Sequence, residues 1–209
     1  MTDTQPIVFA SSNAGKIREL DELLAPLGMQ VKSQVEMGVE PLPETAVTFI
    51  ENAIVKARHA SSITGLGAIA DDSGLEVDAL DGAPGLYSAR FAAMHDAGSG
   101  DSDNNALLLK KLKNVADNKR GARFRSVMVF LRHENDPSPV IAEGVWEGHI
   151  LRTVMSGGGF GYDPVFCNHD TNTAASLLDK HEKNRLSHRG QAVAQLIARL
   201  SDAYKPKVT

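Results

Sequence analysis

Cysteine is almost absent from this sequence, which contains Cys167 alone among its 209 residues. One cysteine excludes an intramolecular disulfide and a zinc site built from several thiolates, and it fits a reducing compartment. No apolar run approaches the length of a transmembrane helix, and the first residues supply neither the basic nor the apolar region of a secretory signal. We therefore expect a cytoplasmic protein with no membrane partner.

The sequence also lacks an excess of positive charge. Its 22 Lys and Arg residues against 26 Asp and Glu residues give a formal net charge of −4. A general nucleic-acid binder needs a basic surface, so no nucleic-acid partner is expected, although local basic groups can still bind a small polyphosphate. With 42% hydrophobic and 23% charged residues, the chain is predicted to form one domain or two lobes that share a core.

Two adjacent carboxylates, Asp71 and Asp72, follow the short apolar run Leu66–Ala70. This pattern predicts a buried strand that ends with both acids at the turn formed by Ser73 and Gly74. Neighbouring residues of an extended chain point to opposite sides, so we expect the two acids to have different roles. Because Mg²⁺ commonly binds one or two carboxylates together with waters and substrate phosphates, we interpret them as the metal end of a phosphate-handling site.

Two adjacent acids in a turn also permit other interpretations. Two Asp residues in a turn can simply cap and solvate it, and this alternative stays open. A calcium-binding EF-hand loop is excluded because Leu75, the fifth residue counted from Asp71, cannot coordinate calcium. The Asp-x-Asp pattern of aspartyl-phosphate phosphatases is excluded because its second acid would fall at Ser73.

Near the N-terminus, the apolar segment Ile7–Ala10 predicts a strand that leads through a polar turn into a helix with leucines at helical spacing. Ser12 or Asn13 can cap this helix, and its unpaired amide groups together with Lys16 can bind a phosphate. The turn is not a Walker loop, because Ile17 stands where a hydroxyl should hold the metal. An ordinary helix cap with a solvated lysine is the alternative.

The apolar pattern from Val47 to Ala60 predicts a second helix. Its opposite side carries a polar stripe, which consists of Thr48, Asn52, Lys56 and His59. Polar stripes usually face solvent. This helix leads directly into the strand before Asp71, however, so its start can lie near the acids, and Glu44 is a candidate metal carboxylate.

Further along, the stretch from Phe91 to Asn105 is rich in Gly, Ser and Asp and predicts a mobile loop around the isolated His95. A helix is predicted to follow over 105–115. The segments Arg123–Arg132 and Val140–Val145 have the alternating apolar pattern of an antiparallel strand pair, which predicts a mixed sheet.

Four of the five residues from Gly157 to Gly161 are glycine. Ordering such a segment costs much conformational entropy, which favours a role in which the backbone closely approaches a ligand. The neighbouring aromatic residues Phe160 and Tyr162 are candidates for stacking on a base. A flexible hinge with one core aromatic residue is the alternative.

Ser187 is predicted to cap the last helix, which places His188 and Arg189 in its first turn. Cations there oppose the helix dipole, and such a local conflict is more common where function requires it. A single histidine is more often structural than catalytic, but the cluster with Lys183 favours a role in binding.

Four separated motifs closely resemble the inosine triphosphate pyrophosphatase family of non-canonical purine nucleotide hydrolases. They are Ser11-Ser12-Asn13-Ala14-Gly15-Lys16, Ala70-Asp71-Asp72-Ser73-Gly74-Leu75, Gly159-Phe160-Gly161-Tyr162-Asp163-Pro164 and Ser187-His188-Arg189-Gly190-Gln191. The stretches 48–53 and 82–90 are similar to that family as well, so the resemblance covers roughly residues 7 to 200.

The resemblance implies an α/β fold, in which a long mixed β-sheet with flanking helices forms two lobes around a central cleft. It implies one pyrophosphatase domain over residues 1–209 and a homodimer. It also implies Mg²⁺-dependent hydrolysis of ITP, dITP and XTP to the monophosphate and pyrophosphate.

By motif match, Asp72 would be the catalytic base and, with Glu44, a ligand of Mg²⁺. The implied contacts with the purine nucleoside triphosphate are Ser11, Ser12, Asn13, Ala14, Gly15, Lys16, Ser73, Phe160, Gly161, Tyr162, Asp163, Lys183, His188 and Arg189, and the charge of Lys56 would add to them. The segment His95–Lys113 matches nothing sharply, and its role is open.

Two other functions compete with this interpretation. One is a metal-dependent phosphatase that releases inorganic phosphate, and the other is a non-catalytic purine-nucleotide sensor. Paired acids disfavour the sensor, because carboxylates repel a polyphosphate unless a metal ion intervenes.

Overall fold

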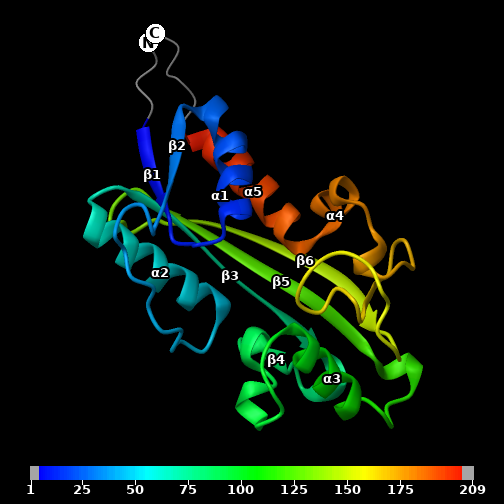
Figure 1. Ribbon diagram of the computed structural model, residues 1–209. Helices are drawn as coiled ribbons and strands as arrows, with labels where there is room; N and C mark the ends of the chain where they lie inside the picture. Colours follow the sequence, from blue (N-terminus) through cyan, green and yellow to red (C-terminus); the bar gives the residue numbers. More distant parts are fainter. Residues whose placement is uncertain (1–4, 204–209) are drawn as a thin grey trace. The chain divides into compact units, whose positions relative to one another are not determined.

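The computed structural model describes residues 5–203, which form an α/β fold with a seven-stranded sheet and flanking helices (Figure 1). The strands are β1 (Gln5–Phe9), β2 (Met29–Ser33), β3 (Gly67–Val77), β4 (Pro84–Gly85), β5 (Gly121–Leu131), β6 (Val140–Ile150) and β7 (Phe166–Asn168). The helices are α1 (Ala14–Leu24), α2 (Phe49–Thr64), α3 (Asp101–Lys111), α4 (Lys180–Leu186) and α5 (His188–Ala203).

The sheet is mixed, as predicted. Its strand order is β2-β1-β3-β5-β6-β7, with β4 paired to β3. β1 runs parallel to both β2 and β3, whereas the pairs β3–β4 and β6–β7 are antiparallel. All helices within the described residues are too short or too polar to span a lipid bilayer.

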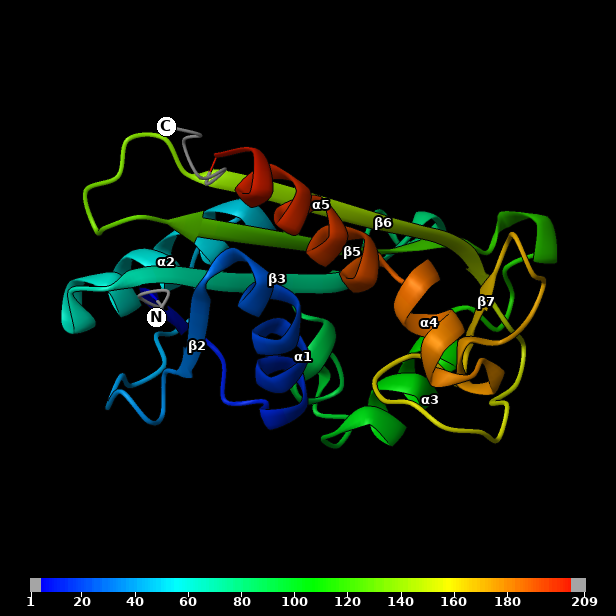
Figure 2. The same cartoon turned by 90° about the horizontal axis from the view of Figure 1, so that it is seen from above.

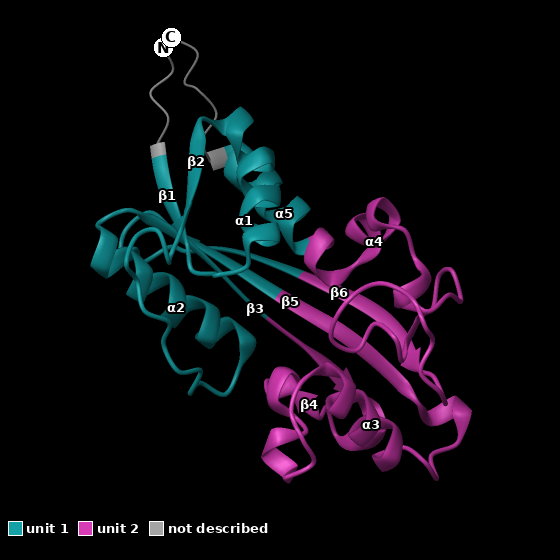
Figure 3. Ribbon diagram, in the orientation of Figure 1, with its two compact units in different colours: residues 1–72, 127–143, 192–209 teal, residues 73–126, 144–191 magenta. Residues whose placement is uncertain are grey.

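The described chain divides into two compact units (Figure 3). Unit 1 comprises residues 5–72, 127–143 and 192–203, and unit 2 comprises residues 73–126 and 144–191. Because these boundaries fall inside elements, β3, β5, β6 and α5 each contribute residues to both units.

In unit 1, helices cover both faces of the sheet (Figures 1 and 2). Ile7 and Phe9 of β1 pack in a cluster with the apolar sides of α1 and α5. Val8, which points the other way, packs with the alanines of α2. Because successive side chains of a strand point to opposite faces of the sheet, β1 packs against α1 and α5 on one face of unit 1 and against α2 on the other.

The predicted second helix begins slightly later than its apolar pattern. Thr48 is the N-cap, and its hydroxyl oxygen accepts a hydrogen bond from the Glu51 N–H at 3.2 Å. Val47 precedes this cap and is exposed. Gly65 ends the helix in a left-handed conformation with φ of 68°.

β3 does not end at the two acids, so the predicted turn at Ser73 and Gly74 is wrong. The strand continues to Val77, and Leu75 pairs with Gly85 of β4. Leu75 and Val77 are buried and resume the apolar alternation beyond the acids. The acids interrupt the hydrophobic pattern without interrupting the strand, because each of them finds a polar partner inside the fold.

The loop predicted from Phe91 to Asn105 is also wrong in part. Phe91 and Ala92 are buried, and Ala93–His95 form a 3-10 turn. α3 begins at Asp101, four residues before the predicted start at Asn105. Acidic residues in its first turn suit the positive end of the helix dipole, which explains why a segment rich in Asp starts a helix here.

Unit 2 has its own apolar core. Leu108 of α3 and the C-cap residue Leu112 pack in it with aromatic residues of the strands, namely Phe124, Trp146 and Phe166. Tyr162, from the glycine-rich segment, belongs to the same core cluster.

Gly190, in the first turn of α5, provides a test of the packing within unit 2. A Cβ atom at this position would overlap the backbone carbonyl oxygen of Asn184, which cannot rotate away. We expect Gly190→Ala to lower the free energy of unfolding by about 2–3 kcal/mol through overpacking. For a chain of this size, the thermal midpoint should fall by roughly 5–10 °C.

Gly158→Ala is the matched control, because its Cβ would meet Ser176 O only at 4.0 Å. Thermal unfolding followed by circular dichroism compares the two variants. Equal midpoints for both would contradict the packing around Gly190.

Candidate active site

The carboxylates of Asp71 and Asp72 point to opposite faces of unit 1. Asp71 lies on the α1 side, where its Oδ2 accepts a hydrogen bond from Lys16 Nζ at 2.6 Å. Asp72 lies on the α2 side and accepts hydrogen bonds from Asn52 Nδ2 at 3.0 Å and Lys56 Nζ at 3.2 Å. Both acids are buried. Their different partners agree with the expectation that adjacent acids on a strand separate.

Lys56 connects Asp72 with Glu44, because its Nζ also donates to Glu44 Oε1 at 3.1 Å. Burial lowers the pKa of the Lys56 ammonium, but the carboxylates of Asp72, Glu44 and Asp71 outweigh burial and raise this pKa. Burial raises the pKa of the Asp72 carboxyl, and Glu44 adds to the rise, whereas Lys56 and Asn52 oppose it. The net pKa of Asp72 lies above its ordinary value. Two acids therefore share one cation in a partly desolvated site.

Asn52 is a site residue that the motif comparison did not assign. It is buried, and its Oδ1 accepts a hydrogen bond from the Ala46 N–H at 3.1 Å while its Nδ2 donates to Asp72. Together, the two hydrogen bonds fix the orientation of the Asn52 side-chain amide. The polar stripe of α2 was the signal for this residue. Its interpretation as a solvent face is wrong for Asn52 and Lys56, which face Asp72.

The turn before α1 is capped by Asn13, as predicted. Asn13 Oδ1 accepts hydrogen bonds from the Gly15 N–H at 3.0 Å and the Lys16 N–H at 3.1 Å. These two amide groups are therefore engaged by the cap, in contrast to the expectation that they are unpaired. Ser12, Asn13 and Ala14 are exposed. Phosphate binding by this turn stays a prediction that depends mainly on Lys16 and the exposed residues.

In unit 2, the glycine-rich segment forms an ordered turn around Asp163. Asp163 Oδ2 accepts hydrogen bonds from the Phe160 N–H at 2.8 Å and from Lys183 Nζ of α4. Lys183 Nζ also lies 4.7 Å from the centroid of the exposed Phe160 ring. Tyr162 is a core residue whose hydroxyl donates to Ser88 O at 2.8 Å. Its burial leaves no ring face for stacking, so base stacking stays a prediction for Phe160 alone.

The start of α5 places His188 against aromatic side chains. Ser187 Oγ accepts a hydrogen bond from the Gly190 N–H at 3.1 Å, which confirms the predicted cap. The His188 ring stacks on Phe124 with a centroid distance of 4.7 Å and an interplanar angle of 10°. Arg189 is half-buried beside it.

The predicted residues thus fall into two sets, one in each unit. Unit 1 brings together Glu44, Lys56 and Asp72, and it also contains the turn from Ser11 to Lys16. Unit 2 brings together Phe160, Asp163 and Lys183, and it contains His188, Arg189 and the exposed Ser73 of β3.

The chemistry of Asp72 and Glu44 fits Mg²⁺. Both are hard oxygen donors, and both approach the same ammonium group, so they already share a cation. Within residues 5–203, no group of three or more His, Cys, Asp or Glu side chains is arranged to hold a metal ion. Mg²⁺ does not require such a group, because it commonly takes one or two carboxylates and completes its shell with waters and substrate phosphates.

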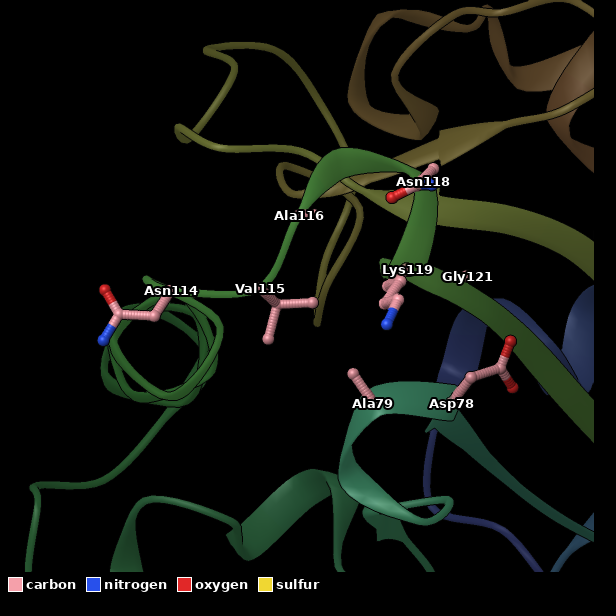
Figure 4. A pocket seen from close by; sticks show the side chains of 8 residues that line it. All are labelled: Asp78, Ala79, Asn114, Val115, Ala116, Asn118, Lys119 and Gly121. Carbon is pink, nitrogen blue, oxygen red and sulfur yellow. The ribbon is translucent and has the colours of Figure 1, made fainter.

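A separate hollow of about 640 Å³ lies in unit 2 (Figure 4). Its lining residues are Asp78, Ala79, Asn114, Val115, Ala116, Asn118, Lys119 and Gly121. The predicted site residues of the described chain lie outside this lining, so the hollow does not mark the candidate active site.

Comparison with known proteins gives a consistent result over nearly the whole chain. The sequence model of the Ham1 family matches residues 7–199. A dITP/XTP pyrophosphatase from Thioalkalivibrio sulfidiphilus is 54% identical over 195 residues, which cover 93% of this chain and 97% of that protein. A dITP/XTP pyrophosphatase from Xanthomonas axonopodis is 54% identical over 190 residues, which cover 91% and 94%.

Among solved structures, a HAM1 protein from Coxiella burnetii matches with a TM-score of 0.89 and 44% sequence identity. The match covers 95% of this chain and 99% of that protein. The fold and the family that the sequence motifs predicted are confirmed.

Proposed function

Because the chain belongs to the Ham1 family, we propose that it hydrolyses the non-canonical purine nucleoside triphosphates ITP, dITP and XTP to the monophosphate and pyrophosphate. The observation that carries this proposal is the buried Asp72 carboxylate, which accepts hydrogen bonds from Asn52 and shares Lys56 with Glu44. Such a group can accept a proton beside a bound polyanion.

In the proposed reaction, Asp72 acts as the general base that takes a proton from the attacking water. Attack occurs at the α-phosphorus, in line with the departing pyrophosphate. Asn52 and Lys56 each bind one oxygen of the carboxylate and hold it in a fixed orientation.

Asp72 and Glu44 are the proposed ligands of Mg²⁺, which when bound would neutralise charge on the triphosphate and on the leaving pyrophosphate. The turn from Ser11 to Lys16 would hold the phosphates, with Lys16 and Lys56 as the cationic groups. Asp71 would orient the Lys16 ammonium, to which it is hydrogen bonded at 2.6 Å.

The unit 2 set is proposed to recognise the base. Hypoxanthine and xanthine carry an acceptor oxygen at C6, where adenine carries a donor amine. Hydrogen-bond donors of the protein can therefore pair with the C6 oxygen of the first two bases, whereas they stay unpaired opposite the C6 amine of adenine. His188 and Arg189 are the proposed donors. Phe160 would stack on the base. The remaining proposed contacts with the nucleotide are Ser73, Gly161, Asp163 and Lys183, whereas the predicted contact Tyr162 is buried and would support the turn that carries them.

Arg189→Ala tests this assignment. Loss of one charged donor should lower kcat/KM for ITP about tenfold more than kcat/KM for ATP, because only ITP presents an acceptor at C6. Arg185→Ala, at an exposed arginine of α4, is the control and should leave the ITP to ATP ratio unchanged. Equal fractional losses for ITP and ATP in Arg189→Ala would contradict the assignment.

Product identification tests the proposed function itself. The protein is incubated with dITP, with and without Mg²⁺, and the products are separated by ion-exchange chromatography. We expect dIMP and pyrophosphate, formed only with the metal ion. Stepwise release of inorganic phosphate would instead indicate a metal-dependent phosphatase, and binding without turnover would indicate a nucleotide sensor.

We further propose that residues 1–209 act as one pyrophosphatase domain of two lobes that share the sheet, and that the protein is a cytoplasmic homodimer. The buried Cys167 thiol agrees with a reducing compartment. Light scattering coupled to size-exclusion chromatography tests the oligomeric state, since a single species with the mass of one chain would exclude the dimer.

A further inference from the structure

α3 is the element for which the sequence suggested no role, and in the structure it binds the glycine-rich turn at Gly161. The Gly161 N–H donates to Asp101 Oδ2 at 2.6 Å, and the Gly161 carbonyl oxygen accepts a hydrogen bond from Asn105 Nδ2 at 2.9 Å. Residues four apart lie on the same side of a helix, one turn from each other. Two side chains of α3 therefore bind both backbone polar groups of a single residue.

Gly161 is the point of the turn that most needs such support. Its φ of 61° lies in the left-handed region, and the flanking glycines have much conformational freedom to lose. The residues on either side are held by other groups, since Phe160 N–H donates to Asp163 and the Tyr162 hydroxyl donates to Ser88 O. The Gly161 peptide groups between them are held by α3.

Asn105 itself indicates that this contact is more than packing. The residue is buried, and within the described chain its Oδ1 has no hydrogen-bond partner. A buried polar atom without a partner is unfavourable, so a position that served only the core would suit an apolar residue better. What Asn105 provides is the donor group that binds Gly161.

We propose that Asp101 and Asn105 are positioning residues for base recognition. By fixing the Gly161 peptide, they hold the exposed Phe160 ring beside Lys183 in the orientation that binds an oxopurine. This inference rests on the proposed function. A looser turn would weaken nucleotide binding while the groups around Asp72, in unit 1, stay unchanged, so the effect should fall on KM rather than on kcat.

Asp101→Ala is the principal test, because Asp101 is exposed and its replacement should not impair folding. We expect KM for dITP to rise about tenfold, the effect of one charge-assisted hydrogen bond, with kcat within about twofold. Asp101→Asn keeps an acceptor oxygen and should restore most of the affinity. Asp103→Ala is the matched control, because Asp103 lies in the same turn of α3 but accepts from the Ser99 N–H at 2.7 Å.

Hydrogen exchange at the Gly161 amide, followed by NMR, adds a readout that does not depend on activity. The amide should exchange faster in Asp101→Ala than in the unmodified protein or in Asp103→Ala. An unchanged KM for dITP in Asp101→Ala would overturn this inference and leave the proposed function standing. Failure of the unmodified protein to hydrolyse dITP would overturn both.

Discussion

Asp72→Asn is expected to lower kcat for dITP hydrolysis about 10³-fold, because it removes the proposed general base, which is also a proposed carboxylate ligand of Mg²⁺. An asparagine has nearly the same shape as aspartate and can still accept a hydrogen bond from Asn52 or Lys56. The fold should therefore be retained, and the loss should appear in kcat. Pyrophosphate release, measured at saturating dITP and Mg²⁺, provides the comparison.

Asp71→Asn is the matched control for this experiment. It makes the same chemical change one residue away, on the α1 side of unit 1, where the partner is Lys16. We expect a loss of about tenfold, mainly in KM, because the change affects the orientation of Lys16, a proposed phosphate-binding group, rather than the proposed base. Equal losses of kcat in the two variants would contradict the separate roles of the two acids.

Lys56→Met is expected to lower kcat/KM for dITP on the order of 10²-fold, since it removes a cation that is proposed to bind phosphate and that is hydrogen bonded to Asp72. It also leaves the carboxylates of Asp72 and Glu44 without the ammonium that both contact. Removing one partner of a buried ion pair typically costs about 3–5 kcal/mol, and the partial exposure of Glu44 should reduce this to about 2 kcal/mol.

The stability loss of Lys56→Met should depend on pH in a definite direction. Lys56 lowers the pKa of Asp72, so without it that pKa rises further above its ordinary value. The folded variant then binds this proton more tightly than the unfolded chain does, and its stability falls as pH rises between the unfolded and folded pKa values of Asp72. The deficit relative to the unmodified protein should therefore be largest near neutral pH and smaller in mildly acidic buffer.

Urea unfolding at several pH values measures this dependence. Lys110→Met, at an exposed lysine of α3, is the control and should show little deficit at any of these pH values. A Lys56→Met deficit that grows as the solution is acidified would contradict the proposed environment of Asp72.

Local patterns predicted much of this structure. The caps at Asn13 and Ser187 follow from residue type and position, and the side chains accept the expected backbone hydrogen bonds. The opposite orientation of Asp71 and Asp72 follows from strand geometry alone. These features depend on residues that are close in the sequence.

The features that the sequence did not predict depend on distant partners. β3 continues through its two acids because Lys16 and Lys56, which come from other elements, bind them inside the fold. The residues next to the acids in the sequence do not indicate these distant partners. Two adjacent acids after an apolar run are therefore interpreted as the end of a strand. For the same reason the sequence leaves open whether an aromatic residue of the glycine-rich segment lies in the core, whereas the structure places Tyr162 in the core of unit 2.

The contact between α3 and Gly161 could not be predicted from the sequence for a related reason. Asp101 and Asn105 have the composition of a polar loop, and their partner, Gly161, lies 60 and 56 residues further along the chain. Glycine presents only backbone groups to them, so neither residue type nor spacing indicates the contact.

The Asp72 carboxylate is the proposed ligand of the divalent cation at which the triphosphate is hydrolysed. Mn²⁺ has the same preference for carboxylate oxygen as Mg²⁺ and is visible by electron paramagnetic resonance. Titration with Mn²⁺, in the presence of an α,β-methylene analogue of dITP, measures this binding directly. We predict that the unmodified protein and Asp71→Asn bind the ion, whereas Asp72→Asn binds it at least about tenfold more weakly. Equal Mn²⁺ affinity in Asp72→Asn and the unmodified protein would contradict the claim.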